Sequence, residues 1–361
     1  MKYVNVIINS AYTAPYISLI ERNFKSEDHL FFVIRGWSES KVKIPVQNNV
    51  IPINNISNLL NGFRLIYSLN RCRKIVLHGL FSPFLLLILV LQPWLLKKSN
   101  WVIWGGDLYQ YNAPKDTLYK KFEEFLRRIV LRNIAEITTV IKGDYNLAKK
   151  WYNVKGRLRY AMYSVPLNTN AIDKIIKSNV KPSENPGSVS ILIGNSADPG
   201  NNHFEIIEIL KKFKNEEILI YSLLNYGDSD YADKVIEYGK KEFGEKFIGI
   251  VDYMQYDDFI LFMNNIEIIV FNHKRQQALG NLFLAYYLKK KVFINTESTL
   301  YEFFRDDLGL TIRSTLQIPE LNFQQFVSTT DDEVKNNRLK VTNVLEEDYI
   351  VNQWRLLFDK E

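Results

Sequence analysis

Residues 191–203 read Ile-Leu-Ile-Gly-Asn-Ser-Ala-Asp-Pro-Gly-Asn-Asn-His, and residues 268–281 read Ile-Ile-Val-Phe-Asn-His-Lys-Arg-Gln-Gln-Ala-Leu-Gly-Asn. In each stretch an apolar strand runs into a loop of small, hydrogen-bonding residues, and that loop opens a helix. α/β proteins bind phosphate at such strand-to-helix turns, through backbone amides and the helix N-terminus. The second stretch adds two cations, Lys274 and Arg275, as a diphosphate would require.

Strand-like and helix-like segments alternate on both sides of these stretches, which predicts parallel sheets covered on both faces. In the first half we expect strands at 4–8, 30–34, 75–78, 101–104 and 137–140, with helices at 16–24, 56–70, 83–96, 118–133 and 144–151. In the second half we expect strands at 189–193, 218–222, 247–250, 266–271 and 292–295, with helices at 202–214, 231–243, 256–264 and 280–288.

The chain of 361 residues is 47% hydrophobic, which favours two domains of about 160–180 residues each over a single core. We expect an α/β fold of two Rossmann-like domains with parallel sheets facing across a cleft. The predicted boundaries are an N-terminal domain over 1–165, a linker over 166–187, a C-terminal domain over 188–345, and a helix over 346–361 that packs back on the first domain.

The net charge of +6 suits nucleic acid, an anionic membrane surface or a nucleotide-linked substrate. No nucleic-acid motif accompanies the basic clusters, so we expect no nucleic-acid partner. Neither a Cys/His set with metal-ligand spacing nor a Gly-x-Gly-x-x-Gly pattern occurs, so we expect no metal and no cofactor. The single cysteine, Cys72, fits a reducing compartment, and the first residues resemble a strand more than a signal peptide, which predicts a cytoplasmic protein.

The most apolar run covers residues 84–96 and ends in Lys97 and Lys98. It is shorter than the ~20 residues of a spanning helix, and Pro93 interrupts it. One interpretation is a buried helix of the first domain. The alternative is a monotopic face that dips into a bilayer, with Trp94 and the two lysines at the headgroup level.

The candidate diphosphate-binding site takes residues from both opening stretches. Gly194 permits close backbone approach, while Asn195 and Ser196 can donate to phosphate or sugar oxygens, although the same residues are typical of a capping turn. Arg275 can bind two phosphate oxygens and stabilise the charge that grows on a leaving diphosphate; the alternative is a solvated basic turn. Lys274, Gln276, Gln277, Gly280 and Asn281 complete this predicted set. Glu297 could accept from ribose hydroxyls or only cap a helix, and Tyr256 lies in a stretch that could contact a nucleobase.

In the first domain, residues 77–81 (Leu-His-Gly-Leu-Phe) and 101–109 (Trp-Val-Ile-Trp-Gly-Gly-Asp-Leu-Tyr) end predicted strands, so they face the ligand edge of the sheet. Asp107 and His78 are candidate general bases for an attacking hydroxyl. A lone histidine is more often structural, and Gly-Gly-Asp can be a simple turn. We expect His78, Trp104, Asp107 and Tyr109 to bind the molecule that carries this hydroxyl.

Taken together these motifs resemble glycosyltransferase family 56, the TDP-N-acetylfucosamine:lipid II N-acetylfucosaminyltransferases of enterobacterial common antigen synthesis. The resemblance rests on segments that follow in family order and span most of residues 77–300: His78-Gly-Leu-Phe81, 101–109, Lys142-Gly-Asp144, 193–198 with Asn202-His203, Arg275-Gln-Gln277 with Gly280, and Asn295-Thr-Glu297. Two positions depart from the pattern. Gln110 replaces an expected acidic residue, and Lys274 stands where the family tends to have a small one.

The resemblance implies a GT-B enzyme that works without a metal. It would transfer a 4-acetamido-4,6-dideoxy-galactose unit from a dTDP-sugar bound by the second domain to an undecaprenyl-diphosphate-linked saccharide received by the first. It further implies a peripheral protein on the cytoplasmic face of the bacterial inner membrane, which we expect to rest on anionic lipid through residues 84–98 and 118–132. Two alternatives stay open: a UDP-sugar-dependent transferase, and a non-catalytic nucleotide-sugar-binding module.

Overall fold

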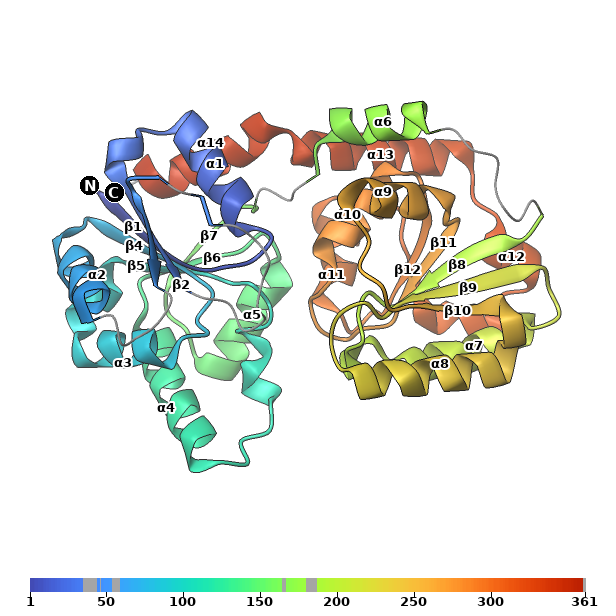
Figure 1. The fold of residues 1–361 in the computed structure, drawn as a ribbon, viewed down its shortest axis with the longest axis horizontal. Helices are drawn as coiled ribbons and strands as arrows, with labels where there is room; N and C mark the ends of the chain where they lie inside the picture. The colour runs from blue at the N-terminus through green and yellow to red at the C-terminus, as the bar shows by residue number, and fades with distance from the viewer. Residues whose placement is uncertain (35–43, 46, 54–58, 164–166, 180–186, 360–361) are drawn as a thin grey trace. The chain divides into compact units, whose positions relative to one another are not determined.

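The chain folds into two compact α/β units (Figure 1). The computed structural model describes residues 1–34, 44–45, 47–53, 59–163, 167–179 and 187–359. Residues Met1–Pro166 and Leu345–Glu361 form the N-terminal unit, and residues Leu167–Val344 form the C-terminal unit. Each unit is a parallel sheet with helices on both of its faces.

The sheet of the N-terminal unit has the strand order β3-β2-β1-β4-β5-β6-β7, and every pairing is parallel. Its strands are β1 (Tyr3–Ile8), β2 (His29–Ile34), β3 (Val50–Ile53), β4 (Lys74–His78), β5 (Ser99–Val102), β6 (Glu136–Thr138) and β7 (Arg157–Arg159). Its helices are α1 (Thr13–Asn23), α2 (Leu59–Arg71), α3 (Pro83–Leu91), α4 (Leu118–Asn133), α5 (Lys142–Tyr152) and α14 (Glu347–Asp359), with short 3₁₀ turns η1 (Ser26–Asp28), η2 (Pro93–Lys98) and η3 (Tyr109–Asn112).

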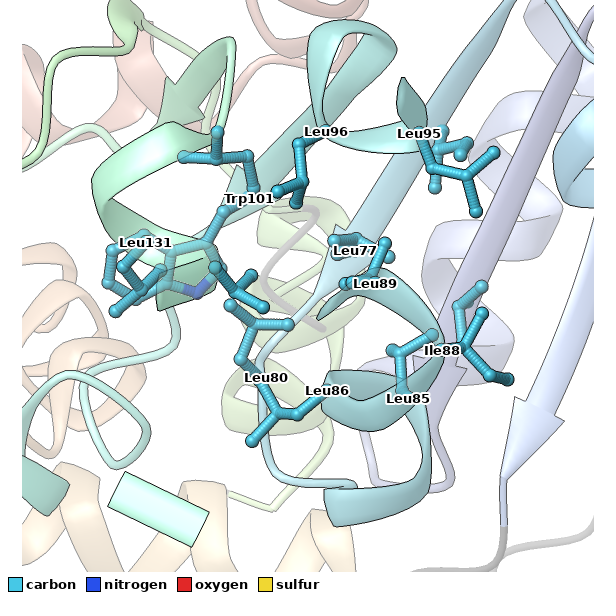
Figure 2. Close-up of a cluster of buried hydrophobic side chains, with 14 of the residues drawn as sticks. Leu77, Leu80, Leu85, Leu86, Ile88, Leu89, Leu95, Leu96, Trp101 and Leu131 are labelled. Carbon is cyan, nitrogen blue, oxygen red and sulfur yellow. The ribbon is translucent and has the colours of Figure 1, made fainter. Parts of the chain in front are cut away.

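Helices α2, α3 and α4 cover one face of this sheet, and α1 and α14 cover the other (Figure 1). The core beneath α3 is rich in leucines and includes the buried ring of Trp101 (Figure 2). Helix α3 ends at Leu91, because Pro93 lacks the N–H that the next turn needs, and η2 begins there. The apolar run is therefore two short helices, where the sequence predicted one over 83–96.

The C-terminal helix α14 packs on the N-terminal unit, as the fold prediction required. Trp354 is fully buried and donates from Nε1 to the Met162 carbonyl at 2.9 Å. Lys74 Nζ donates to the Leu357 carbonyl at 2.8 Å, and the Tyr3 hydroxyl donates to the Phe358 carbonyl at 2.9 Å. These bonds join the last helix to the first and fourth strands.

The sheet of the C-terminal unit has the order β10-β9-β8-β11-β12-β13 and is also parallel. Its strands are β8 (Val189–Ile193), β9 (Ile218–Leu223), β10 (Phe247–Ile250), β11 (Ile268–Phe271), β12 (Lys291–Ile294) and β13 (Arg313–Ser314). Its α-helices are α6 (Thr169–Ser178), α7 (His203–Leu210), α8 (Ser229–Phe243), α9 (Tyr256–Asn265), α10 (Leu279–Tyr287), α11 (Thr299–Glu302), α12 (Phe323–Val327) and α13 (Asp331–Leu345). Shorter turns are η4 (Pro199–Asn201), η5 (Lys211–Phe213), η6 (Gly244–Lys246), η8 (Thr315–Glu320) and a π-helical turn η7 (Phe303–Asp307).

Part of the segment expected as a linker is helical. Helix α6 is capped by Asn168, whose side chain accepts from the Ala171 amide at 3.0 Å. Asp173 pairs with Arg338 at 3.0 Å, which ties α6 to α13 within the C-terminal unit. Residues 164–166 and 180–186, which belong to or adjoin that expected linker, lie outside the described residues. Within the residues that are described, no helix is long and apolar enough to cross a bilayer.

Candidate functional site

Both sheets reverse their direction of growth next to their first strand. In the C-terminal unit the chain moves from β8 outward to β9 and β10, and then returns to add β11 on the other side of β8. Open parallel sheets bind ligands at the carboxyl ends of the strands that flank such a switch point. The loops after β8 and β11, residues 194–202 and 272–278, lie there, and they are the two stretches that the sequence singled out.

The loop after β8 is shaped by Gly194 and Asn201. Gly194 has φ +63°, and a Cβ atom at this position would collide with the ring of His203, so the turn requires glycine. Buried Asn201 holds the loop from inside: its Oδ1 accepts from the Asn195 amide at 3.1 Å, and its Nδ2 donates to the Ser196 carbonyl at 3.0 Å. Sequence reasoning missed Asn201, although an asparagine after Pro-Gly is a typical turn residue.

Side chains from the two loops meet in a group that we call the loop junction: Asn195, Asp198, Asn201, Arg275 and Gln277. Gln277 Nε2 donates to Asn195 Oδ1 at 3.2 Å and to Asn201 Oδ1 at 3.0 Å. Arg275 Nε donates to Gln277 Oε1 at 2.8 Å. Asn195 and Gln277 are therefore in direct contact, although these two predicted donor residues are 82 positions apart in the sequence.

Arg275 is held by the junction but remains open to solvent. Its Nη2 lies 2.6 Å from Asp198 Oδ2, and the side chain is 37% exposed. The other oxygen, Asp198 Oδ1, accepts from the Gly200 amide at 2.7 Å. A guanidinium has five N–H donors, and within the described residues Asp198 and Gln277 take two of them. The remaining donors suit an anion that approaches from solvent.

Lys274 and Glu297 form an exposed ion pair beside the junction, with Nζ 2.9 Å from Oε1. The hydrogen bond and the charge of Glu297 raise the pKa of Lys274. The pair joins the loop after β11 to the loop after β12. Because exposed pairs of this kind contribute little stability, both groups can exchange their partner for a ligand.

The other predicted donor residues differ in burial and in their contacts. Gln276 has a buried side-chain oxygen with no hydrogen-bond partner among the described residues. Gly280 and Asn281 lie in the first turn of α10, which begins at Leu279. Ser196 is buried and accepts from Asn201 Nδ2 at 3.2 Å. Tyr256 is the first residue of α9 and interacts with the backbone of Asn168, away from the junction contacts.

In the N-terminal unit the switch point lies between β1 and β4, and His78 is the last residue of β4. The imidazole is fully buried, which lowers its pKa to about 3 and keeps it neutral. Its Nε2 donates to Asn5 Oδ1 at 3.2 Å, an oxygen that also accepts from the Tyr16 hydroxyl at 3.1 Å. The opposite nitrogen, Nδ1, accepts from the hydroxyl of Tyr163.

Asp107 is fully buried and accepts three hydrogen bonds. Its Oδ2 accepts from Trp101 Nε1 at 2.5 Å and from the Leu80 amide at 3.0 Å, and its Oδ1 accepts from the Trp104 amide at 3.0 Å. Burial raises the pKa of this carboxyl, against those hydrogen bonds. Through these contacts Asp107 holds the loop after β4 against the loop after β5, and its role as a general base stays a prediction.

Only some of the predicted acceptor residues lie close together. The ring of Tyr163 packs edge-on against both His78 and Trp104, at centroid distances of 5.5 and 5.6 Å. Tyr109 instead packs on Trp151 of α5, at 5.3 Å. Sequence reasoning missed Tyr163, because the residue follows the short strand β7 and stands in no recognisable motif. A half-buried tyrosine thus links two of the four expected residues at the ligand edge of the sheet.

Comparisons with known proteins agree with this geometry. The family model described as 4-alpha-L-fucosyltransferase, glycosyl transferase group 56, matches residues 19–351. Among solved structures, a glycosyltransferase from Rickettsia africae is similar with a TM-score of 0.65 at 14% identity, covering 99% of this chain and 98% of that one. WaaG, a glycosyltransferase involved in lipopolysaccharide biosynthesis, gives 0.64 at 10% identity, covering 99% and 100%. Sucrose-phosphate synthase from Thermosynechococcus elongatus gives 0.65 at 10% identity, covering 99% and 98%. These similarities show the GT-B fold.

Proposed function

We propose a donor and an acceptor for this glycosyltransferase, because the chain belongs to the 4-alpha-L-fucosyltransferase family, glycosyl transferase group 56. The enzyme moves a 4-acetamido-4,6-dideoxyhexose from a dTDP-sugar to an undecaprenyl-diphosphate-linked saccharide. The C-terminal unit binds the donor and the N-terminal unit binds the acceptor. The reaction serves bacterial surface polysaccharide assembly. It takes place at the cytoplasmic face of the inner membrane.

The observation that carries the donor assignment is the loop junction. Arg275 lies at the switch point of the C-terminal sheet, beside a glycine turn and the first turn of α10. Phosphate oxygens placed there receive donors from Arg275, from Lys274 and from the amides that open α10. The carboxylate of Glu297 is then available to the pentose hydroxyls.

In the transfer step the acceptor hydroxyl oxygen forms a bond to the anomeric carbon. The bond from that carbon to the β-phosphate oxygen breaks, the diphosphate leaves with the electron pair, and the hydroxyl proton is released. Negative charge grows on the leaving diphosphate, and Arg275 is already oriented toward it by Asp198 and Gln277. Fixed donors of this kind lower the barrier because they need no reorganisation as the charge develops.

For the acceptor we assign contacts to Tyr163, Trp104 and His78 in preference to Asp107. Both oxygens of Asp107 already accept hydrogen bonds from buried donors, whereas Tyr163 is half-buried and its hydroxyl is oriented by His78 Nδ1. Because burial keeps His78 neutral, its Nδ1 accepts the hydrogen bond that orients the Tyr163 hydroxyl toward the acceptor, and the proton of the attacking hydroxyl leaves to solvent.

The membrane partner is supported by exposed apolar side chains on the sheet face covered by α2, α3 and α4 (Figure 1). Helix α4 exposes Leu118, Tyr119, Phe122 and Phe125 among basic residues that include Lys120 and Lys121. Leu91 and Trp94 are exposed near the end of α3, and Leu60, Phe63 and Tyr67 are exposed on α2, which sequence reasoning missed. Apolar side chains with neighbouring cations suit an anionic lipid surface.

Two residues of the predicted basic surface have other partners. Arg127 is buried, where it donates to the Leu80 carbonyl and pairs with Glu123 at 2.6 Å. Lys98, expected at the headgroup level, donates to the carbonyls of Asn70 and Cys72 at 2.9 and 2.7 Å. Lys97 remains exposed. The lipid-facing cations that we propose are therefore Lys97 and Lys121, together with Lys120, whose exposed pair with Asp116 at 2.9 Å can give way to a lipid phosphate.

The first test is calorimetric titration with dTDP, UDP and GDP on the wild-type protein, on Arg275→Ala and on Arg355→Ala. Arg355 is an exposed arginine of α14 and controls for loss of one positive charge. We expect dTDP to bind best, Arg275→Ala to weaken it, and Arg355→Ala to leave it unchanged. Turnover of a dTDP-sugar should fall about 10²-fold or more in Arg275→Ala, the scale of losing one transition-state donor.

Other outcomes separate the alternatives. A preference for UDP would keep a transferase but replace the assigned sugar. Donor binding with neither hydrolysis nor transfer, in the presence of lipid-linked acceptor, would indicate a binding module. Unchanged turnover in Arg275→Ala would remove this arginine from the mechanism.

A further inference from the structure

An exposed tyrosine ring stands beside the loop junction and takes no part in the assignments above. Tyr226 follows β9, the strand next to β8, and is 58% exposed. Its hydroxyl accepts from Asn195 Nδ2 at 2.8 Å. Asn195 is itself buried and accepts from Gln277, which in turn accepts from Arg275. A continuous series of hydrogen bonds therefore joins this ring to the proposed diphosphate-binding arginine.

The backbone around Tyr226 is fixed to the loop after β8. The Ala197 amide donates to the Tyr226 carbonyl at 2.8 Å, and the Asp228 amide donates to the Ala197 carbonyl at 2.9 Å. These bonds form a short parallel bridge between Ala197 and Gly227. Gly227 has φ +119°, and a side chain there would collide with the backbone of Ala197, so the close approach depends on glycine. The ring is thus held at both its hydroxyl and its backbone.

The neighbouring loop presents further apolar side chains at the same edge of the sheet. The β9–β10 pairing ends with Leu223 opposite Ile250, and the Leu224 amide donates to the Ile250 carbonyl at 2.8 Å. Val251 and Tyr253, which follow directly, are 51% and 77% exposed. Two successive strands therefore end in exposed apolar groups on the β9–β10 side of the junction.

We infer that Tyr226 is the stacking platform for the pyrimidine base of the nucleoside diphosphate, with Val251 and Tyr253 alongside. The inference rests on the proposed donor site. A planar base needs an apolar face that is rigid before binding, because ordering a free ring would cost affinity. Tyr226 meets this need, and its anchor Asn195 sets the ring beside the group that takes the phosphates. Stacking of this kind contributes affinity without a strong choice among pyrimidines.

The test uses calorimetric titration with dTDP and, separately, with inorganic pyrophosphate. The proteins are the wild type, Tyr226→Phe, Tyr226→Ala and Tyr160→Ala, the last being an exposed tyrosine of the N-terminal unit. We expect Tyr226→Ala to weaken dTDP binding by about tenfold or more, the scale of one lost base stack. Tyr226→Phe keeps the ring and removes only the hydrogen bond to Asn195, so we expect its affinity for dTDP to fall by only about a few-fold. Pyrophosphate binding should be equal in all four proteins.

The outcomes distinguish this inference from the proposed function. If the wild type binds dTDP and Tyr226→Ala binds it equally well, the stacking platform is excluded while the donor site stands. If Tyr226→Ala loses pyrophosphate and dTDP to the same degree, Tyr226 only supports Asn195 and the inference is again wrong. If the wild type binds neither compound, the donor site itself fails, and the inference fails with it.

Discussion

At the scale of single residues, the partners of a side chain decide its role, and the sequence does not reveal those partners. Asp107 and Arg275 both follow predicted strands, and both received a chemical role from that position. In the structure Asp107 is enclosed by three donors, whereas Arg275 keeps more than a third of its surface exposed. From the sequence we could predict that polar residues follow these strands. We could not predict that the Trp101 indole would donate a hydrogen bond to Asp107.

Replacing Asp107 with asparagine tests its structural role. The variant places an amide group among the three buried N–H donors that Asp107 accepts from. Its NH₂ group cannot accept, so the single amide oxygen leaves at least one of these donors without an acceptor. We expect the free energy of unfolding of the N-terminal unit to fall by about 2–3 kcal/mol, since a buried unsatisfied donor costs about 1–3 kcal/mol. Intrinsic fluorescence measures this directly, because all six tryptophans belong to the N-terminal unit.

The exposed Asp116→Asn serves as the control for Asp107→Asn and should leave stability unchanged, since its pair with Lys120 lies at the surface. A variant Asp107→Asn that unfolds like the wild type but has lost transfer activity would contradict the structural role. It would restore the general base that the sequence suggested.

At the scale of helices and strands, long apolar or amphipathic segments and the edge strand β10 were predictable, whereas the edge strands β3, β7 and β13 were not. Helix α4 spans residues 118–133 as expected, and the structure shows that the Thr117 side chain caps it. The strand β3 is only four residues long and carries Pro52, which is atypical of a strand, and β7 reads Arg-Leu-Arg and shows no apolar run. Both lie at sheet edges, where pairing to one neighbour suffices and sequence constraints are weak.

The exposed face of α4 makes a prediction about membranes. Phe122 and Phe125 are one turn apart and exposed, on a helix whose other side packs Leu126 and Val130 into the core. The double variant Phe122→Ser/Phe125→Ser should reduce binding to anionic vesicles by roughly tenfold or more, because each buried side chain of this kind contributes about 1.5–3 kcal/mol. Co-sedimentation with phosphatidylglycerol vesicles at low salt measures it.

Two comparisons make the vesicle experiment decisive. Leu339→Ser changes an exposed leucine on α13 of the C-terminal unit and should leave vesicle binding intact. Neutral vesicles should bind the wild type more weakly than anionic ones, since Lys120 and Lys121 flank the phenylalanines. Equal binding to both kinds of vesicle, or no effect of the double variant, would exclude α4 as the lipid-facing element.

At the scale of the whole molecule, the N-terminal unit is formed by two separate segments of the chain. The chain builds the N-terminal unit, builds the C-terminal unit, and then returns to complete the first with α14. The sequence indicated a final helix through its apolar residues 354–358. It could not show that the ring of Trp354 would pack against both His78 and Tyr163, residues of the candidate acceptor site.

This arrangement predicts that the last helix stabilises the first unit and its site together. Trp354 is fully buried, so Trp354→Ala should lower the stability of the N-terminal unit by about 3–5 kcal/mol, the usual cost of deleting a large buried ring. It should weaken binding of the lipid-linked acceptor and leave dTDP binding unchanged. Leu356→Ala, on the exposed side of the same helix, controls for helix content. Circular dichroism melting and dTDP titration provide the two measurements. If Trp354→Ala lowered dTDP affinity but left the melting of the N-terminal unit unchanged, α14 would act on the donor site, and its role in completing the first unit would be refuted.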